Sequence, residues 1–269
     1  MIKKALLILI FPFISACVPE IPTSLKDFLF PEEPRESITK GLSPKGLFSL
    51  AKEHERNGET DLAINAFNQL QAAYPSSKYS IQAKLEIIYT LYKRERYDEA
   101  ISELNDYIKL YPNHFSTPYA YYMRALSSEA KSKSVLDEFE ITDNAQRDIK
   151  SVQDAFNYYL ALIKKFPNSQ YSVESKSILV KLRNVLSRHE LFVAIFYFNQ
   201  EAYIASINRC KFIIETYPNT PSVPAAIHLM MENYKKIGAN DLANDAKRVL
   251  QLSYPEYIPH YTLEIDESK

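Results

Sequence analysis

The order of apolar and polar residues along this chain predicts amphipathic helices that come in pairs. Ala63, Phe67, Leu70 and Tyr74 are spaced four, three and four residues apart, which places them on one face of a helix that Pro75 ends. The same pattern of a small residue, helical text and an aromatic-proline pair occurs five times, at Ala63 to Tyr74-Pro75, Ala100 to Tyr111-Pro112, Ala155 to Phe166-Pro167, Ser206 to Tyr217-Pro218 and Ala243 to Tyr254-Pro255. The chain therefore consists mainly of one repeated unit.

Each part of this pattern has a structural reason. The small residue lets a second helix cross closely, and the proline ring keeps the aromatic residue before it out of the helical conformation. Residues suited to capping the next helix follow the proline, namely Ser76-Ser77, Asn113, Asn168-Ser169 and Asn219-Thr220. We therefore predict that the repeated unit is a helix hairpin.

The spacing of the units indicates a solenoid. Successive prolines of the pattern are 37, 55, 51 and 37 residues apart, a little above the ~34 of a tetratricopeptide repeat, with two enlarged units in the middle. Such hairpins bury a continuous core only by stacking, and the first helix of each pair then lines a groove of the kind that binds polypeptides. The predicted fold is all-α, a right-handed α-solenoid of about five tetratricopeptide-like hairpins over residues 43–258, before a polar tail at 259–269.

Several boundaries inside this array can be predicted. The first helix of the second repeat should run from Tyr79 to Arg94, and that of the fourth from Tyr171 to Asn199. The charged segment between Lys131 and Lys150 shows no apolar stripe, so we interpret it as an exposed loop inserted into the third repeat. Gly238 should end a helix of the fifth repeat.

The amino-acid composition and net charge exclude some classes of fold and partner. With four glycines in 269 residues the chain has little material for tight β-turns, and 20 tyrosines without a tryptophan provide amphipathic surfaces for both core and groove. The formal net charge of −1 argues against a nucleic-acid partner held by phosphate contacts.

Residues 1–16 read as a bacterial export signal, with Lys3-Lys4 ahead of an apolar run too short to span a bilayer. Ile14-Ser15-Ala16-Cys17 has the residue order of a lipobox, in which the cysteine thiol receives a diacylglycerol and becomes the first residue of the mature protein. The alternative is a chance cysteine behind a general leader. Because Val18 rather than Asp follows the cysteine, we expect a lipid anchor at Cys17 in the periplasmic face of the outer membrane.

The segment at residues 17–42 is rich in proline and predicts an extended tether between the anchor and the repeats. It carries a small apolar patch from Leu25 to Phe30, which is equally well interpreted as a docking strand for a partner.

Five stretches of the mature chain resemble, in order, the BamD family, also called ComL. They are Tyr74-Pro75-x-Ser77-x-Tyr79, Leu85-x-x-Ile88-Tyr89-x-x-Tyr92-Lys93, Leu110-Tyr111-Pro112-Asn113-His114, Phe166-Pro167-Asn168-Ser169-Gln170-Tyr171, and Ala205-x-Ile207-Asn208-Arg209 with Tyr217-Pro218-x-Thr220. A single Tyr-Pro pair is a weak signal, whereas the ordered set behind a lipobox is specific.

The resemblance implies a lipid-anchored scaffold of the β-barrel assembly (BAM) machinery in the Gram-negative outer membrane. Members of the family bind the periplasmic POTRA domains of the barrel subunit BamA through their C-terminal repeats and unfolded barrel proteins through their N-terminal repeats. Carried over by motif, Asn208 and Arg209 belong to the BamA-facing region. The substrate groove would use Gln82, Leu85, Tyr89, Tyr92 and Lys93. Other BAM lipoproteins are further expected partners.

Each of these residues also has a structural interpretation. Tyrosine at helical spacing is often core, and Arg209 is equally well explained as a solvated salt bridge. No catalytic group is visible, because Val193 stands where a zinc protease with His189-Glu190 would need its second histidine, and His54, His114, His189, His228 and His260 fall in different repeats. We predict no enzyme, cofactor or metal; a periplasmic repeat scaffold that coordinates cell-wall synthesis with envelope constriction is the alternative function.

Overall fold

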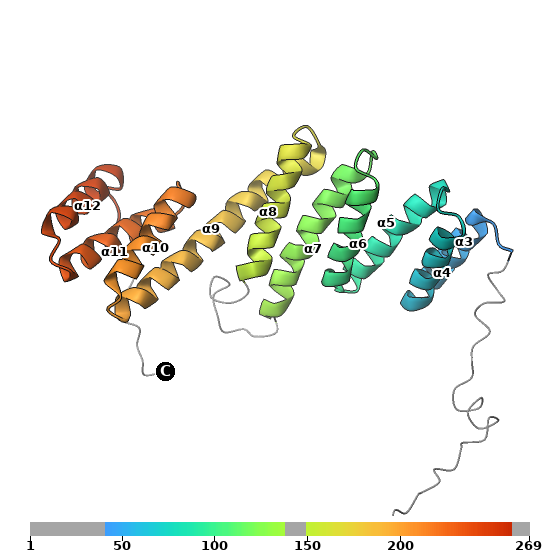
Figure 1. The fold of residues 1–269 in the computed structure, drawn as a ribbon, viewed down its shortest axis with the longest axis horizontal. Coiled ribbons are helices and arrows are strands. Elements are labelled where there is room, and N and C mark those ends of the chain that lie inside the picture. Colours follow the sequence, from blue (N-terminus) through green and yellow to red (C-terminus); the bar gives the residue numbers. More distant parts are fainter. Residues whose placement is uncertain (1–40, 138–148, 260–269) are drawn as a thin grey trace, which may run out of the picture. The chain divides into compact units, whose positions relative to one another are not determined.

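A computed structural model describes residues 41–137 and 149–259, and this part of the chain contains α-helices and no strand (Figure 1). The helices are α3 (Pro44–Arg56), α4 (Thr60–Ala73), α5 (Lys78–Lys93), α6 (Tyr97–Leu110), α7 (Thr117–Asp137), α8 (Ile149–Lys165), α9 (Gln170–Asn199), α10 (Tyr203–Thr216), α11 (Ser222–Lys236) and α12 (Asn240–Ser253). The predicted all-α class is confirmed. The export signal, Cys17 and the segment Leu25 to Phe30 lie outside the described residues.

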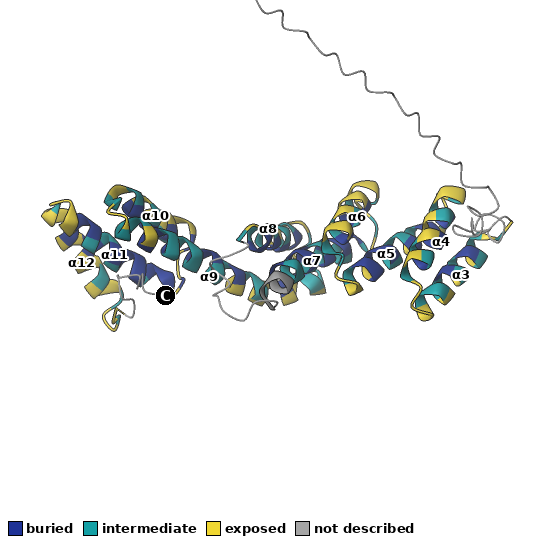
Figure 2. Ribbon diagram, turned by 90° about the horizontal axis from the view of Figure 1, so that it is seen from below, coloured by how far each residue is buried: buried dark blue, intermediate teal, exposed yellow. Residues whose placement is uncertain are grey.

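The helices form five consecutive hairpins, α3/α4 to α11/α12, and each helix packs against the next along the chain. The first helices of neighbouring hairpins also touch, α3 with α5, α7 with α9 and α9 with α11. Most helices have one buried side toward their neighbours and one exposed side (Figure 2). The predicted stack of helix hairpins is therefore confirmed.

The small residue of the repeated pattern lies at a helix crossing in every copy. Ala63, Ala100, Ala155 and Ser206 are 0% exposed, and Ala243 is 4% exposed. A larger side chain at any of these positions would force the two helices of the hairpin apart. A small residue therefore recurs at this position because the second helix of each hairpin packs closely against its neighbours.

The aromatic residue before each proline ends the second helix. Tyr74, Tyr111, Tyr217 and Tyr254 have φ between −139° and −121° and ψ between 52° and 61°, and the backbone N–H of each still donates to the carbonyl four residues earlier. The backbone leaves the helix at this residue, as the following proline ring requires.

A buried hydroxyl then binds the carbonyl of that aromatic residue. Thr117 Oγ1 donates to Tyr111 O at 2.6 Å and Ser172 Oγ donates to Phe166 O at 2.7 Å, and Ser80 Oγ makes the equivalent bond to Tyr74 O. In all three the hydroxyl lies six residues after the aromatic residue. Because a buried carbonyl without a partner costs free energy, this bond fixes the turn and the start of the next hairpin.

Two of the predicted capping sites are confirmed and two are wrong. Ser77 and Ser169 accept the backbone N–H groups of Tyr79 and Tyr171 at 3.2 and 3.3 Å. Asn113 lies four residues before α7 and does not cap it. Asn219 takes a left-handed conformation with φ of 61°, and Thr220 Oγ1 donates to Tyr217 O at 2.9 Å, so the Asn219-Thr220 pair shapes the turn rather than capping α11.

The enlarged middle repeats are only partly as expected. The long first helix of the fourth repeat is confirmed by α9, and α11 ends before Gly238, whose φ of 76° suits a helix stop. The insertion was predicted as a loop from Lys131, but α7 continues to Asp137; residues 138–148 lie outside the described part. Sequence pattern misses this end because the last turns of α7 lack an apolar stripe.

Polar bonds inside the stack join helices of the same or neighbouring hairpins. The amide of Asn233, 0% exposed, donates to Ser206 Oγ at 2.9 Å, and Ser206 Oγ donates to Ala194 O at 2.8 Å. These bonds tie α11 and α10 to α9. In the third hairpin Tyr159 Oη donates to Glu129 at 2.8 Å. Burial and the nearby Glu129 raise the pKa of Tyr159 well above its usual range, which keeps this donor protonated.

Candidate protein-binding surfaces

Helix α5 carries the predicted groove residues on one side of its surface. Tyr89 is 42% exposed, and Lys93 Nζ lies 5.7 Å from the centre of its ring, within the range of a cation–π contact. Among the described residues Lys93 has no ion-pair partner. Tyr89 and Lys93 together therefore present an aromatic surface beside an available positive charge.

Tyr92 and Leu85 are less accessible than their predicted place in a binding groove requires. Both pack partly against the core cluster that contains Ile88, Leu104 and Tyr107. The Tyr92 ring also meets the Tyr97 ring at a centroid distance of 5.7 Å. Their first role is to hold α5 against α6 and α7, and they reach the surface only in part.

A groove opens between the first turns of α5 and the segment before α7. Its volume is ≈ 510 Å³, and its lining is mainly apolar and aromatic, contributed by Lys78, Tyr79, Ile81, Gln82, Leu85, His114, Phe115 and Ser116. The predicted residues Gln82 and Leu85 lie in it. Phe115, which is 87% exposed, was missed by sequence reasoning because it falls in a turn outside any helical stripe.

A hydrogen-bonded histidine holds the Phe115 side of the groove. The Ser116 N–H donates to His114 Nδ1 at 3.3 Å, so that nitrogen is an acceptor, and the Tyr107 hydroxyl donates to it at 2.9 Å. Burial raises the pKa of Tyr107, which keeps its hydroxyl protonated. The centres of the His114 and Phe115 rings lie 4.3 Å apart, so the fully buried Tyr107 positions the partly buried His114 beside the exposed Phe115.

Tyrosines of α7 and α9 extend the aromatic surface. The Tyr122 and Tyr171 rings stack at 5.2 Å, and the Tyr119 ring lies 5.7 Å from Tyr171. Burial raises the pKa of Tyr119 and Tyr122, with Glu86 adding to the first and Glu174 to the second. These hydroxyls therefore remain hydrogen-bond donors at neutral pH. The sequence places all of these tyrosines on helices but does not reveal that they meet.

A second surface lies on α10, where the motif places Asn208 and Arg209. Asn208 is exposed, and Arg209 Nη1 lies 2.9 Å from Glu190 Oε2 of α9, with the Arg209 side chain 43% exposed. The salt-bridge interpretation of Arg209 is thus correct, but the side chain as a whole stays partly accessible. Ile204 and Phe212, 59% and 40% exposed, lie one turn before and one turn after Asn208. An exposed apolar pair therefore accompanies the polar pair.

No site for catalysis is evident within 41–137 and 149–259. Burial raises the pKa of Cys210 to about 12, which leaves its thiol protonated and unreactive. Within the same ranges there is no group of three or more His, Cys, Asp and Glu side chains that would hold a metal ion. None of the helices described is both long and apolar enough to span a bilayer.

A family model and several named relatives match most of this chain. A family model described as "YfiO: Outer membrane lipoprotein" matches residues 41–250. The outer membrane protein assembly factor BamD of Xylella fastidiosa is 31% identical over 84% of this chain and 77% of its own length. The proteins of the same name from Neisseria gonorrhoeae and Vibrio cholerae are 31% and 29% identical over 81% and 80% of this chain, and over 82% and 90% of their own lengths.

Solved structures with a similar helical arrangement have low sequence identity. A tetratricopeptide repeat protein from Parabacteroides merdae has a TM-score of 0.36 and 14% identity, with 80% of each chain covered. Because the family model and the named relatives both cover most of the repeat array, the chain belongs to the BamD (YfiO) family of outer membrane lipoproteins.

Proposed function

We propose that the chain is a lipid-anchored scaffold subunit of the outer-membrane β-barrel assembly complex, which binds BamA and helps to insert and fold barrel proteins. The relatives named as outer membrane protein assembly factors support this role. The observation that carries it is the exposed aromatic surface of the first helices, where Tyr89 and Lys93 lie on the same helix as the wall of a ≈ 510 Å³ groove.

The N-terminal surface suits an unfolded barrel protein. Such a protein typically presents a terminal strand that ends in an aromatic residue and a carboxylate. Tyr89 supplies apolar contact for that aromatic residue, and the adjacent Lys93 supplies the opposite charge for the carboxylate. Tyr79 and Phe115, nearer the start of α5, supply apolar contact for earlier residues of the strand. Ordering a flexible peptide opposes these contacts, so we expect micromolar affinity, on the order of −8 kcal/mol.

The α10 surface suits a folded partner, the periplasmic domains of BamA. Arg209 presents a planar donor that Glu190 holds in place, and planar donors of this kind bind carboxylates with two hydrogen bonds. Ile204 and Phe212 add apolar area next to it. An apolar contact beside an oriented arginine is the composition common at the centre of protein interfaces.

The lipid anchor is tested by Cys17→Ser. We expect this variant to lose labelled fatty acid and to leave the membrane fraction as an unprocessed or soluble periplasmic form, because three acyl chains hold a protein where a single one binds only marginally. Cys210→Ala, which removes the other cysteine, should keep the label. Label retained in Cys17→Ser would refute the anchor.

The BamA surface is tested by Arg209→Glu. We expect at least about a ten-fold loss in capture of the BamA periplasmic region, equivalent to ~1.4 kcal/mol, because the change reverses the charge offered to the partner. Lys247→Glu makes the same charge change at an exposed position of α12, outside the α10 surface, and should bind like the wild type. Glu190→Gln removes the internal ion pair but keeps the guanidinium, and should retain binding.

Binding can be measured by pull-down and titration calorimetry, with the helical content checked by circular dichroism. If Arg209→Glu and Lys247→Glu bind equally well while both stay folded, Arg209 belongs only to its salt bridge with Glu190.

The substrate groove is tested with Tyr89→Ala and a labelled peptide from the C-terminus of a barrel protein. Loss of the exposed ring and its contact with Lys93 should weaken binding about ten-fold by fluorescence anisotropy. Leu110→Ala is a matched control, since Leu110 is 63% exposed but belongs to α6 and not to the α5 surface that carries Tyr89 and Lys93. Equal affinities for wild type, Tyr89→Ala and Leu110→Ala would place the peptide site elsewhere.

A further inference from the structure

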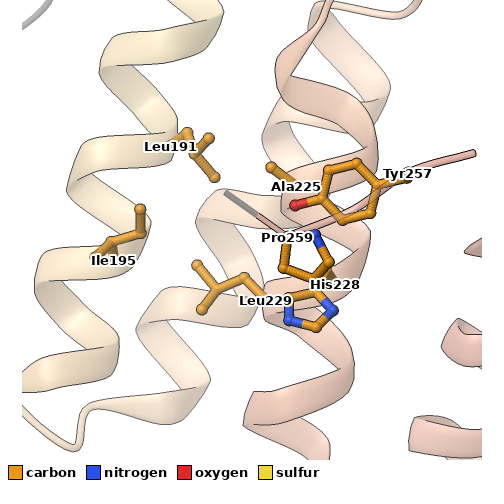
Figure 3. A pocket seen from close by; sticks show the side chains of 7 residues that line it. All are labelled: Leu191, Ile195, Ala225, His228, Leu229, Tyr257 and Pro259. Atoms are coloured by element: carbon orange, nitrogen blue, oxygen red, sulfur yellow. The ribbon is translucent and has the colours of Figure 1, made fainter. Parts of the chain in front are cut away.

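The end of the array closes an apolar pocket that leaves little room for a ligand (Figure 3). Tyr257 and Pro259, which follow α12, lie beside Leu191 and Ile195 of α9 and Leu229 of α11. Only ≈ 10 Å³ of free space remains inside, about enough for one water molecule. The described residues that line the pocket include no Lys, Arg, Asp or Glu. The pocket therefore stabilises the last repeats, and a charged ligand needs a different surface.

Positively charged side chains gather between α6 and α8, the second helices of two successive hairpins. Arg124 of the intervening helix α7 reaches both of them. Its Nη1 donates to Asn105 Oδ1 of α6 at 2.8 Å, and its guanidinium carbon lies 4.2 Å from the centre of the Tyr158 ring of α8. The same carbon lies 5.0 Å from the ring centre of Tyr121, one turn earlier on α7. One hydrogen bond and two cation–π contacts thus hold Arg124 in place.

A lysine from α8 meets the same tyrosine. Lys165 Nζ donates to Tyr121 Oη at 3.1 Å and lies 5.1 Å from the centre of the Tyr121 ring. Lys165 is exposed, whereas Tyr121 is buried. Two cations, the Lys165 ammonium and the Arg124 guanidinium, are therefore held against one aromatic ring, where they repel each other.

A lysine from α6 is placed to join these two cations. Lys109 is exposed and lies four residues after Asn105, on the same side of α6. The consecutive helices α6 and α7 pack together and run in opposite directions (Figure 1). One turn beyond Asn105 on α6 therefore corresponds to one turn before Arg124 on α7, which is the level of Tyr121.

The positive charge of this cluster is not balanced within the described part of the chain. There, none of Lys109, Arg124 and Lys165 pairs with an Asp or Glu, although Lys131, further along α7, pairs with Asp98 of α6 at 2.6 Å. Among the same residues the buried Arg124 Nε has no acceptor. Burial lowers the pKa of Arg124, yet a guanidinium stays charged at neutral pH. A partly desolvated cation without a counter-charge costs free energy, so a bound anion stabilises it.

The two lysines have a simpler role as well. Both lie in the last turn of their helices, where a positive charge interacts favourably with the helix dipole. That interaction does not apply to Arg124, which lies within α7, and it does not explain why Lys165 is directed onto Tyr121. The arrangement around Tyr121 therefore suits an anion that bridges three helices.

We propose that Lys109, Arg124 and Lys165 form a binding site for a phosphate group beside Tyr121. A planar guanidinium donates two hydrogen bonds to neighbouring oxygens of such a group, and the ammonium groups bind its remaining oxygens. A phosphate monoester carries a charge of about −1.5 to −2 at pH 7, which balances three cations better than a single carboxylate does. A soluble phosphate compound and a lipid head group both present this chemistry. The site shares no residue with the α5 groove or the α10 surface, so it can be filled while they hold polypeptides.

The proposal is tested by titrating inorganic phosphate into the full chain with Cys17→Ser, at constant ionic strength kept with chloride. The buried Nε–H of Arg124 exchanges slowly enough for NMR, and its signal is assigned by its loss in Arg124→Lys. We expect this signal to shift and saturate with phosphate, and to shift less with acetate at the same concentration. Lys109→Gln and Lys165→Gln should each weaken phosphate binding several-fold. Lys247→Gln, at an exposed position of α12, is the control and should bind like the parent chain.

Vesicles distinguish the two sources of the phosphate group. If the head group of a lipid is the ligand, sedimentation with phosphatidylglycerol vesicles falls in the double variant Lys109→Gln, Lys165→Gln but not in Lys247→Gln, and phosphatidylcholine vesicles bind neither. Phosphate binding without vesicle binding identifies a soluble phosphate compound. An unchanged Arg124 signal, an equal response to acetate, or equal phosphate affinities of Lys165→Gln and Lys247→Gln with normal helicity by circular dichroism would overturn the proposal.

Discussion

The structure depends on one repeated interaction, the satisfaction of the carbonyl of the aromatic residue before each proline. At Tyr111 the carbonyl accepts both the His114 N–H and the Thr117 hydroxyl, and Phe166 is bound in the same way by Ser169 N–H and Ser172. Proline ends one helix, but these two bonds determine where the next one starts. Because the turns after Tyr74, Tyr111 and Phe166 share this pair of bonds, the first helices that follow them start at the same place in each repeat.

The fold could be predicted from sequence because its determinants are local. Proline at the turn and a small residue at the crossing act within one hairpin, so their spacing alone reveals the unit. The hydroxyl six residues after the aromatic residue was not recognised, since its partner is visible only when the turn has formed. The end of α7 at Asp137 was missed for a different reason, because its last turns carry no apolar stripe to mark a helix.

The candidate site could be predicted less well, because exposure is decided by neighbouring helices. Spacing places Tyr89 and Tyr92 on one side of α5, but only the packing of α6 shows that Tyr92 is half-buried against Tyr97 while Tyr89 is open. Arg209 could be located by its motif, whereas its partner Glu190 lies 19 residues earlier on α9. Phe115, the most exposed aromatic residue of the groove, belongs to a turn that carries no periodic signal.

The two proposed surfaces have separate roles. The α10 surface holds a folded subunit, while the α5 groove binds an unfolded chain weakly and releases it. The most direct test is barrel-protein insertion into liposomes that contain purified BamA, with and without the full-length lipidated chain. We predict that adding the chain accelerates insertion and that a version carrying both Tyr89→Ala and Arg209→Glu does not. Equal insertion rates with and without the wild-type chain would contradict its role in barrel assembly.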